Sequence, residues 1–198
     1  MGANRLKRVV ISRRECITMR GTAESRGCIA RRGMPASGWR NEEMAEDIAG
    51  TACGVRPDMQ AVLRQEDLCV LATASPEGPH CSLMAYICNE DCTKLYMVTL
   101  KETRKFSNLQ GNESVSVLID NRLASQDRRI MQALTLRGRF QMLTDPPTLA
   151  DIRRRFLARH PHLTNLAASG DACFFAIAIE SLQLLTGATE ASYQSLAE

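Results

Sequence analysis

The segment L-Y-M-V-T-L-K-E-T-R-K-F-S-N-L, residues 95–109, says more about the fold than any other part of the chain. Its first half is rich in β-formers, and Thr103 then begins a short helix as an N-cap. Arg104 and Lys105 would lie in the first helical turn, where the helix dipole disfavours cations. A bound phosphate would reverse that effect by accepting the free backbone N–H groups, the Thr103 hydroxyl and both cations. A solvated basic turn has the same pattern, so the motif alone leaves both interpretations open.

The segments on either side of this motif predict short strands joined by turns. An apolar run, Leu68 to Ala74, ends at the turn S-P-E-G of residues 75–78, and Cys81 to Ile87 follows as its hairpin partner. Further strands are expected at Lys94 to Leu100 and Ser114 to Asp120. A chain of such strands and turns is typical of a mainly β domain.

The C-terminal half continues this pattern around one helix. Ala133 to Leu143 alternates strictly between apolar and polar residues, which predicts a half-buried strand. The dipeptide D-P at 145–146 supplies a helix N-cap and an N1 proline, and the helix should end near His160. The last strands are expected at Ala172 to Ile179 and Leu182 to Leu185. Short strands with closely spaced turns favour a β-barrel with a few helices over a parallel α/β sheet.

Charge divides the chain into a basic leader and a mildly acidic body. Residues 1–40 hold ten Lys or Arg and two acidic residues, whereas the remainder holds fifteen basic and twenty acidic residues. We predict a disordered tail over residues 1–50 and one domain over residues 55–190, opened by a helix at Asp58 to Gln65. The leader is interpreted as an Arg-rich targeting peptide or as an extension upstream of a true start near Met44.

Composition also excludes some partners. The basic character belongs to the leader alone, so nucleic-acid binding by the body is not expected. No apolar run reaches the roughly 18 residues of a membrane span, and no secretory signal precedes the body. We therefore expect a cytoplasmic protein without a membrane partner.

The eight cysteines show no regular paired spacing of a disulfide framework or a zinc site. Most are expected to be reduced, buried small residues. Cys88 and Cys92, in C-N-E-D-C, flank a predicted hairpin turn at which two thiols could approach one another. No Ser-His-Asp set, paired-carboxylate site or phosphate-binding P-loop is visible, so the sequence assigns no catalytic residue and no metal site.

Three motifs in this order resemble a known family. They are L-A-T-A-S-P-E-G-P-H-C-S-L-M-A-Y at 71–86, the segment 95–120 that begins L-Y-M-V-T-L-K-E-T-R-K, and L-T-L-R-G-R-F-Q-M-L-T-D-P at 134–146. Residues about 57 to 190 resemble the pyridoxamine 5′-phosphate oxidase-related proteins, particularly short FMN-binding members and haem-utilisation proteins built on the same barrel. The resemblance implies an FMN-binding split β-barrel of Greek-key type.

The resemblance also implies a cofactor site in a cleft shared by the two subunits of a homodimer. The strand from His80 to Tyr86 would lie along the isoalloxazine ring, and the T-R-K motif would hold the FMN phosphate. A flavin needs a flat apolar wall and fixed cationic donors, which these residue types supply. One further polar residue would come from the second subunit. The cofactor-binding residues expected in this way are His80, Ser82, Leu83, Met84, Val98, Thr99, Thr103, Arg104, Lys105 and Gln132.

The implied function is that of a flavin-dependent oxidoreductase acting on an unknown small substrate or electron donor, with no protein acid or base required. Two departures from the family pattern limit it. The C-terminal sequence T-E-A-S-Y-Q-S-L-A-E lacks the Arg and His that bind pyridoxal in true oxidases, so vitamin B6 oxidation is not expected. The strand from His80 to Tyr86 lacks an Arg and a Lys that contact the cofactor there, which predicts weaker FMN binding.

Two alternatives remain open. The segment F-L-A-R-H-P-H-L resembles the haem-utilisation branch, in which case haem would be the cofactor and His160 and His162 the candidate axial ligands. His80 would then be a third candidate, or would lie near the flavin edge. The second alternative is a flavin carrier without turnover.

Overall fold

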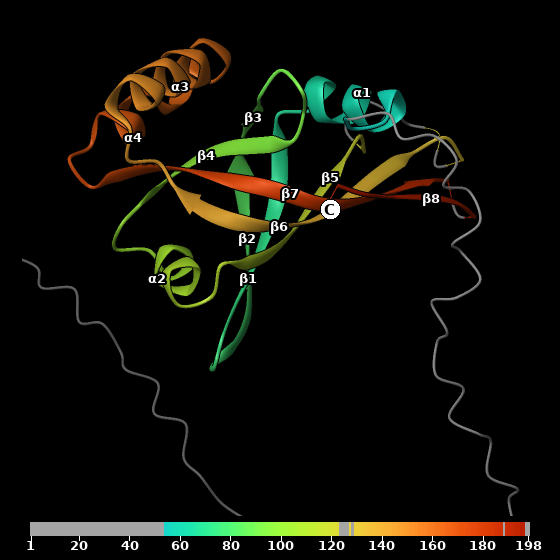
Figure 1. Ribbon diagram of the computed structural model, residues 1–198, viewed down its shortest axis with the longest axis horizontal. Coiled ribbons are helices and arrows are strands. Elements are labelled where there is room, and N and C mark those ends of the chain that lie inside the picture. The colour runs from blue at the N-terminus through green and yellow to red at the C-terminus, as the bar shows by residue number, and fades with distance from the viewer. Residues whose placement is uncertain (1–53, 123–126, 128, 188, 197–198) are drawn as a thin grey trace, which may run out of the picture. The chain divides into compact units, whose positions relative to one another are not determined.

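The computed structural model describes residues 54–122, 127, 129–187 and 189–196. The expectations for the leader therefore lie outside the described residues. Four α-helices surround one antiparallel sheet (Figure 1). The strands are β1 (Leu68–Ser75), β2 (Gly78–Ala85), β3 (Ile87–Cys88), β4 (Lys94–Leu100), β5 (Ser114–Asp120), β6 (Gln132–Met142), β7 (Ala172–Thr186) and β8 (Glu190–Ser195). The helices are α1 (Pro57–Gln65), α2 (Arg104–Gly111), α3 (Pro146–Arg159) and α4 (Thr164–Ala168), with a 3-10 turn at Pro161–Leu163.

The strand order is β2-β1-β5-β6-β7-β4-β3, and β8 pairs with β7. The end strands β2 and β3 are separated by one residue, Tyr86, so the sheet must curl into a half-barrel to bring its two ends together. β3 pairs with the first half of β4, whereas β2 contacts β4 without a ladder among the described residues. The barrel is therefore split between β2 and the second half of β4. This arrangement confirms the predicted mainly β, split-barrel fold.

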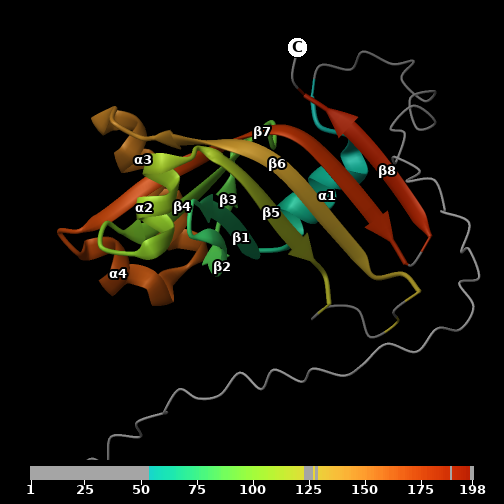
Figure 2. The same ribbon diagram turned by 90° about the horizontal axis from the view of Figure 1, so that it is seen from below.

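β7 is the long strand on which the rest of the sheet is built. One of its edges pairs with β6 over residues 175–186. The other edge pairs with β4 over residues 172–178 and with β8 over residues 181–186 (Figure 2). β7 carries buried side chains on both faces because Phe175 points into the half-barrel and Phe174 points toward α3.

Because β7 is buried on both faces, the domain has two apolar clusters, one on each side of this strand. The main core fills the half-barrel, where Phe140 packs between Phe106 and Phe175. A smaller cluster lies on the outer side of β4 and β7, where Val98 and Phe174 pack against α3 and α4. The smaller cluster holds both helices beside the split.

The structure corrects three sequence-based expectations. The strand predicted from Cys81 to Ile87 is interrupted at Tyr86, whose buried hydroxyl donates a 3.2 Å hydrogen bond to the Leu63 carbonyl. The strands predicted at 172–179 and 182–185 are one strand with a bulge at Glu180, where the pairing with β6 shifts by one residue. β8 and α4 were not predicted, because both are short and depend on packing against β7.

The remaining expected elements agree with the structure to within about two residues at each end. Asp145 caps α3 as predicted, its carboxylate accepting the Thr148 backbone N–H at 2.9 Å. Among the described residues, no helix is long and apolar enough to cross a bilayer.

The bulge between β6 and β7 requires glycine at residue 138. A Cβ on Gly138 would lie 2.4 Å from the Ala178 carbonyl oxygen and 2.8 Å from an Ile177 side-chain carbon. We expect Gly138→Ala to lower the free energy of unfolding by about 1–3 kcal/mol, because the backbone must shift to admit the methyl group. Urea denaturation followed by circular dichroism measures this loss.

The matched control is Gly111→Ala, because a Cβ on Gly111 meets no atom within 4 Å. Its stability should stay unchanged or rise by up to about 1 kcal/mol, as for an unstrained glycine at the end of a helix. Equal effects of the two substitutions would contradict the close approach of β6 and β7 at Gly138.

Candidate functional site

The split of the barrel forms a hollow of about 240 Å³. One wall is the end of β2, and the opposite wall is the end of β4 with the beginning of α2. The third side is closed by α3, α4 and the turn between them. The lining residues are Leu83, Met84, Ala85, Val98, Thr99, Leu100, Thr103, Lys105, Phe156, Leu163 and Leu166.

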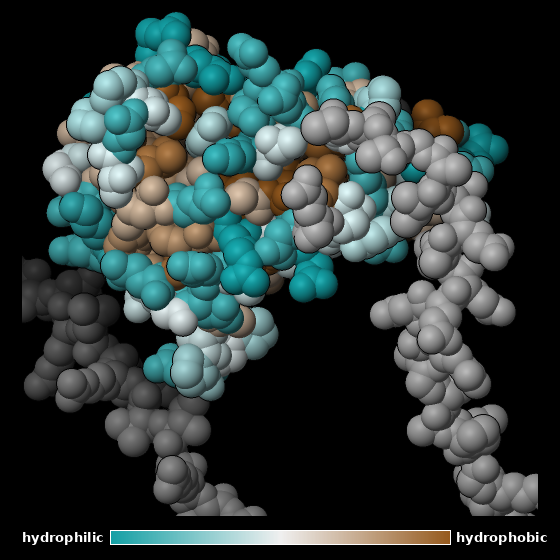
Figure 3. Space-filling model, viewed as in Figure 1, coloured by the Kyte–Doolittle hydropathy of each residue, from teal (hydrophilic) through white to brown (hydrophobic). Residues whose placement is uncertain are grey.

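The hollow brings together six of the ten predicted cofactor residues. They come from β2, from β4 and from the start of α2, and they are Leu83, Met84, Val98, Thr99, Thr103 and Lys105. The hollow is mostly apolar, and Leu83 at its rim is 71% exposed. Figure 3 shows apolar surface on this side of the molecule between α2 and the α3–α4 pair. Walls of this kind are suited to an apolar part of a ligand.

A pair of threonines fixes the connection from β4 to α2. The Thr103 hydroxyl donates to the Leu100 carbonyl at 2.8 Å, so the Thr99 hydroxyl donates the 3.0 Å hydrogen bond that joins the two side chains. Thr103 occupies the N-cap position as predicted, but its hydroxyl accepts no hydrogen bond from the helix. The first turn of α2 therefore keeps backbone N–H groups without a side-chain cap.

Lys105 supplies the positive charge of the hollow. Its side chain is half-buried among the lining residues, and it takes part in none of the ion pairs among the described residues. Lys105 belongs to the first turn of α2, so this cation and the uncapped helix start border the same wall of the hollow. Both favour an anion there, because a cation in the first helical turn is otherwise unfavourable.

Arg104 lies in a separate groove of about 810 Å³ between α2 and the turn that joins β1 to β2. Its Nη2 is 3.6 Å from a carboxylate oxygen of Glu77, and the side chain is about half exposed. Asn108 lines the same groove and donates from Nδ2 to the Thr73 hydroxyl at 3.0 Å. The structure thus separates Arg104 from Lys105, although the motif predicted that they act together.

Three predicted residues lie away from the hollow. His80 and Ser82 belong to β2 and pair with Thr73 and Leu71, nearer to the β1–β2 turn. Gln132 begins β6 and pairs with Thr186, whereas β4 borders the opposite end of β7. Gln132 therefore cannot contribute to the hollow of its own chain.

Sequence reasoning missed the third side of the hollow. Phe156 lies in the helix that is predicted to end near His160, and Leu163 and Leu166 follow that predicted end. The spacing of two leucines after a proline is the one available signal. It does not reveal that the chain turns back against β4.

The sequence profile of the family described as pyridoxamine 5′-phosphate oxidase matches residues 55–186. This chain belongs to the pyridoxamine 5′-phosphate oxidase family. The matched range includes every strand that borders the split and all three helices that line the hollow. No curated protein sequence matches the chain.

Solved structures similar to this member of the pyridoxamine 5′-phosphate oxidase family support the split-barrel fold. A haem-binding protein from Mycobacterium smegmatis has a TM-score of 0.62 at 18% identity, the match covering 71% of this chain and 59% of that one. An FAD-binding protein from Mesorhizobium loti has a TM-score of 0.54 at 22% identity, with 64% and 91% covered. HutZ from Vibrio cholerae, a haem storage protein, has a TM-score of 0.55 at 18% identity, with 67% and 94% covered. The fold is therefore shared by proteins with different cofactors.

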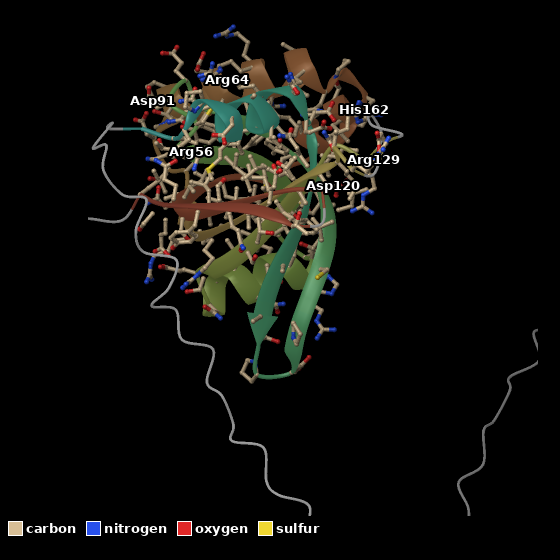
Figure 4. The ribbon with its side chains drawn as sticks, turned by 90° about the vertical axis from the view of Figure 1, so that its right-hand side faces the viewer. Arg56, Arg64, Asp91, Asp120, Arg129 and His162 are labelled. Carbon is tan, nitrogen blue, oxygen red and sulfur yellow. The ribbon has the colours of Figure 1, made fainter. Side chains whose placement is uncertain are left out.

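The histidines of this family member differ sharply in exposure. His160 is only 1% exposed and packs against the tilted ring of Phe156, with 4.7 Å between ring centroids. Its Nε2 lies 3.0 Å from the Tyr86 carbonyl oxygen. A carbonyl can only accept, so Nε2 carries the proton and is not available to a metal. His162 is exposed at the surface (Figure 4). Neither side chain lines the hollow.

We expect His160→Leu to lower the free energy of unfolding by about 1–3 kcal/mol, because it leaves the Tyr86 carbonyl buried without a donor. The control His162→Ala should change stability by no more than about 0.5 kcal/mol, since its side chain is exposed. Thermal or urea denaturation of both variants measures this difference. Unchanged stability of the His160 variant would show that the hydrogen bond to Tyr86 has no structural role.

Proposed function

We propose that this chain is an FMN-binding flavoprotein that acts as a homodimer in electron or hydride transfer with a small molecule. The observation that carries the proposal is the position of Lys105 and the uncapped start of α2 beside an apolar hollow. The apolar walls would contact a ring system at Met84 and Val98. The cationic start of α2 would bind a phosphate beside Lys105. Family membership is consistent with this assignment.

In this proposal each group of residues has a separate task. The apolar walls exclude water from one face of the ring, and Thr99 holds Thr103 so that the helix start stays fixed. Lys105 neutralises the phosphate. A bound flavin would supply the redox chemistry, while the protein positions it and shapes its electrostatic surroundings.

The size of the hollow supports the proposed homodimer. At about 240 Å³ it is smaller than the roughly 300–1,000 Å³ typical of cofactor sites, and Leu83 at its rim is 71% exposed. A second copy of the chain would complete the walls and cover this apolar surface. Gln132, remote from the hollow of its own chain, would then reach the hollow of its partner.

Flavin is favoured over haem because the hollow lacks a suitable metal ligand. None of its lining residues is a histidine, and the Nε2 of His160 is committed to a backbone carbonyl. Absorbance spectra with FMN and with haemin separate the two cofactors. A two-band flavin spectrum retained through gel filtration supports the proposal, whereas a Soret band with no FMN uptake would overturn it.

The phosphate assignment predicts that Lys105→Gln weakens FMN binding about 10- to 100-fold, the loss of one charge-assisted hydrogen bond. Riboflavin, which lacks the phosphate, should bind the variant as well as it binds the unmodified chain. Quenching of flavin fluorescence measures both affinities. Arg104→Gln should have a smaller effect, because that side chain lies in the neighbouring groove beside Glu77.

The control for this experiment is Lys101→Gln, which removes an exposed lysine from the same connection. It should leave both affinities unchanged. An equal loss of FMN and riboflavin affinity in Lys105→Gln would contradict the placement of the phosphate and indicate a general disturbance of the hollow.

The shared site predicts complementation between two defective chains. Lys105→Gln and Gln132→Ala should each bind FMN poorly as homodimers. In a mixed dimer one hollow contains both substitutions and the other contains neither. Half of the dimers in an equal mixture are mixed, so tight binding should return at about a quarter of all sites. Titration after denaturing and refolding the mixture counts these sites. If the refolded mixture contained no tight FMN site, Gln132 would not contribute to the partner's hollow.

A further inference from the structure

The turn between β3 and β4 holds a pair of thiols, at the opposite end of β4 from the apolar hollow. Cys88 Sγ and Cys92 Sγ are 3.8 Å apart. Cys92 is fully buried and Cys88 is half-buried. Two sulfurs at this separation can form a disulfide by small side-chain rotations, since the bond itself is about 2.05 Å long.

The backbone of this turn does not account for a cysteine at residue 92. Cys92 has a φ of +55°, and among the described residues it is the only non-glycine with a positive φ. Glycine or asparagine is usual in that conformation. Asn89 already fixes the turn, because its side chain accepts the Lys94 backbone N–H at 2.9 Å and donates to the Thr93 hydroxyl at 3.0 Å. The backbone conformation therefore does not favour cysteine here, and the side chain lies in the buried core beside Cys88.

Arg64 of α1 places a positive charge on this sulfur. Its Nε donates to Cys92 Sγ at 3.3 Å, while its Nη2 donates to the Glu90 carbonyl at 2.6 Å. Figure 4 shows Arg64 and Asp91 at the same end of the molecule. A guanidinium beside a sulfur stabilises the thiolate, which is the form that attacks a disulfide.

Cys88 is the more exposed of the two cysteines. It lines a hollow of about 270 Å³ together with Arg64, Arg155 and Arg159. Arg155 donates to the Cys88 carbonyl at 3.0 Å, and Arg159 caps the last carbonyls of α1. The lining carries three guanidinium groups and the carboxylate of Glu66, and Asp151 lies 3.7 Å from Arg155. One positive charge remains, which attracts anionic small molecules.

We propose that Cys88 and Cys92 form a redox-active dithiol that exchanges with an anionic low-molecular-weight disulfide of the glutathione kind. Cys88 attacks the small disulfide, forms a mixed disulfide and releases one small thiol, which takes up a proton. Cys92 then attacks the Cys88 sulfur, closes the intramolecular disulfide and releases the second small thiol. The two cysteines lose two electrons and two protons, and the small disulfide gains both.

The test uses the full chain with Cys81→Ser, which removes an exposed thiol that would otherwise react. After incubation with oxidised glutathione, a glutamyl endopeptidase cleaves after Glu77, Glu90 and Glu102. The two cysteines then fall in separate peptides, 78–90 and 91–102. Mass spectrometry without reductant should find these peptides joined, and reductant should separate them.

Two single variants in the same background test the order of the steps. With Cys92→Ser, glutathione should remain attached to Cys88 because the resolving thiol is absent. With Cys88→Ser, the buried Cys92 should stay free. Circular dichroism confirms that each serine variant is folded. The proposal would be overturned if oxidised glutathione did not join the two peptides in the Cys81→Ser chain. It would also be overturned if glutathione were attached to Cys92 in place of Cys88.

The charge of the hollow gives an independent arm of the test. Oxidised glutathione should join the two peptides about tenfold faster than the cationic disulfide cystamine at low salt, and high salt should reduce the difference. Equal rates at low salt would overturn the preference for an anionic disulfide. The readout does not involve flavin, so it is independent of the proposed cofactor site.

Discussion

The covalent link between β2 and β3 is the constraint on which the rest of the structure depends. The two strands lie at opposite ends of the strand order but are joined through Tyr86 alone. The sheet must therefore curl until its ends meet, and the buried Tyr86 hydroxyl fixes the crossing point by donating to the Leu63 carbonyl. Burial raises the pKa of this hydroxyl well above its ordinary value, so it remains a donor. Beyond Tyr86 the ladder cannot continue, and the barrel stays split.

The candidate site lies where the split leaves part of the apolar layer of the sheet uncovered. β4 and β7 must bury both faces, the inner face in the barrel and the outer face beneath α3 and α4. Where β2 diverges from β4, this apolar layer is left open, and the start of α2 reaches the same opening. An apolar wall and an uncapped helix terminus meet there because the β4–α2 connection is held by Thr99 and Thr103.

Several polar side chains outside the hollow stabilise the fold through hydrogen bonds to the backbone. The imidazole of His160 joins α3 to the backbone at Tyr86, and Arg159 covers carbonyls at the end of α1. These contacts give His160 and Arg159 structural roles, because they join α3 to the end of α1 and to the crossing at Tyr86. Burial likewise raises the pKa of the Cys88 thiol to about 11, with the neighbouring Cys92 sulfur as a second cause. Cys88 therefore rests as a thiol near neutral pH.

The sequence by itself determined most of the strands, the T-R-K turn and the family, because alternation, turn residues and helix caps are local signals. It also placed six of the residues that line the hollow. Only the tertiary structure decided that Arg104 and Lys105 diverge, that His160 is buried, and that α4 closes the third side of the hollow. Neighbouring side chains on a helix point in different directions, and which of them meets a cavity depends on elements distant in the chain. Contacts between elements that are distant in the chain produce no periodic pattern in a single sequence, so they could not be predicted from it.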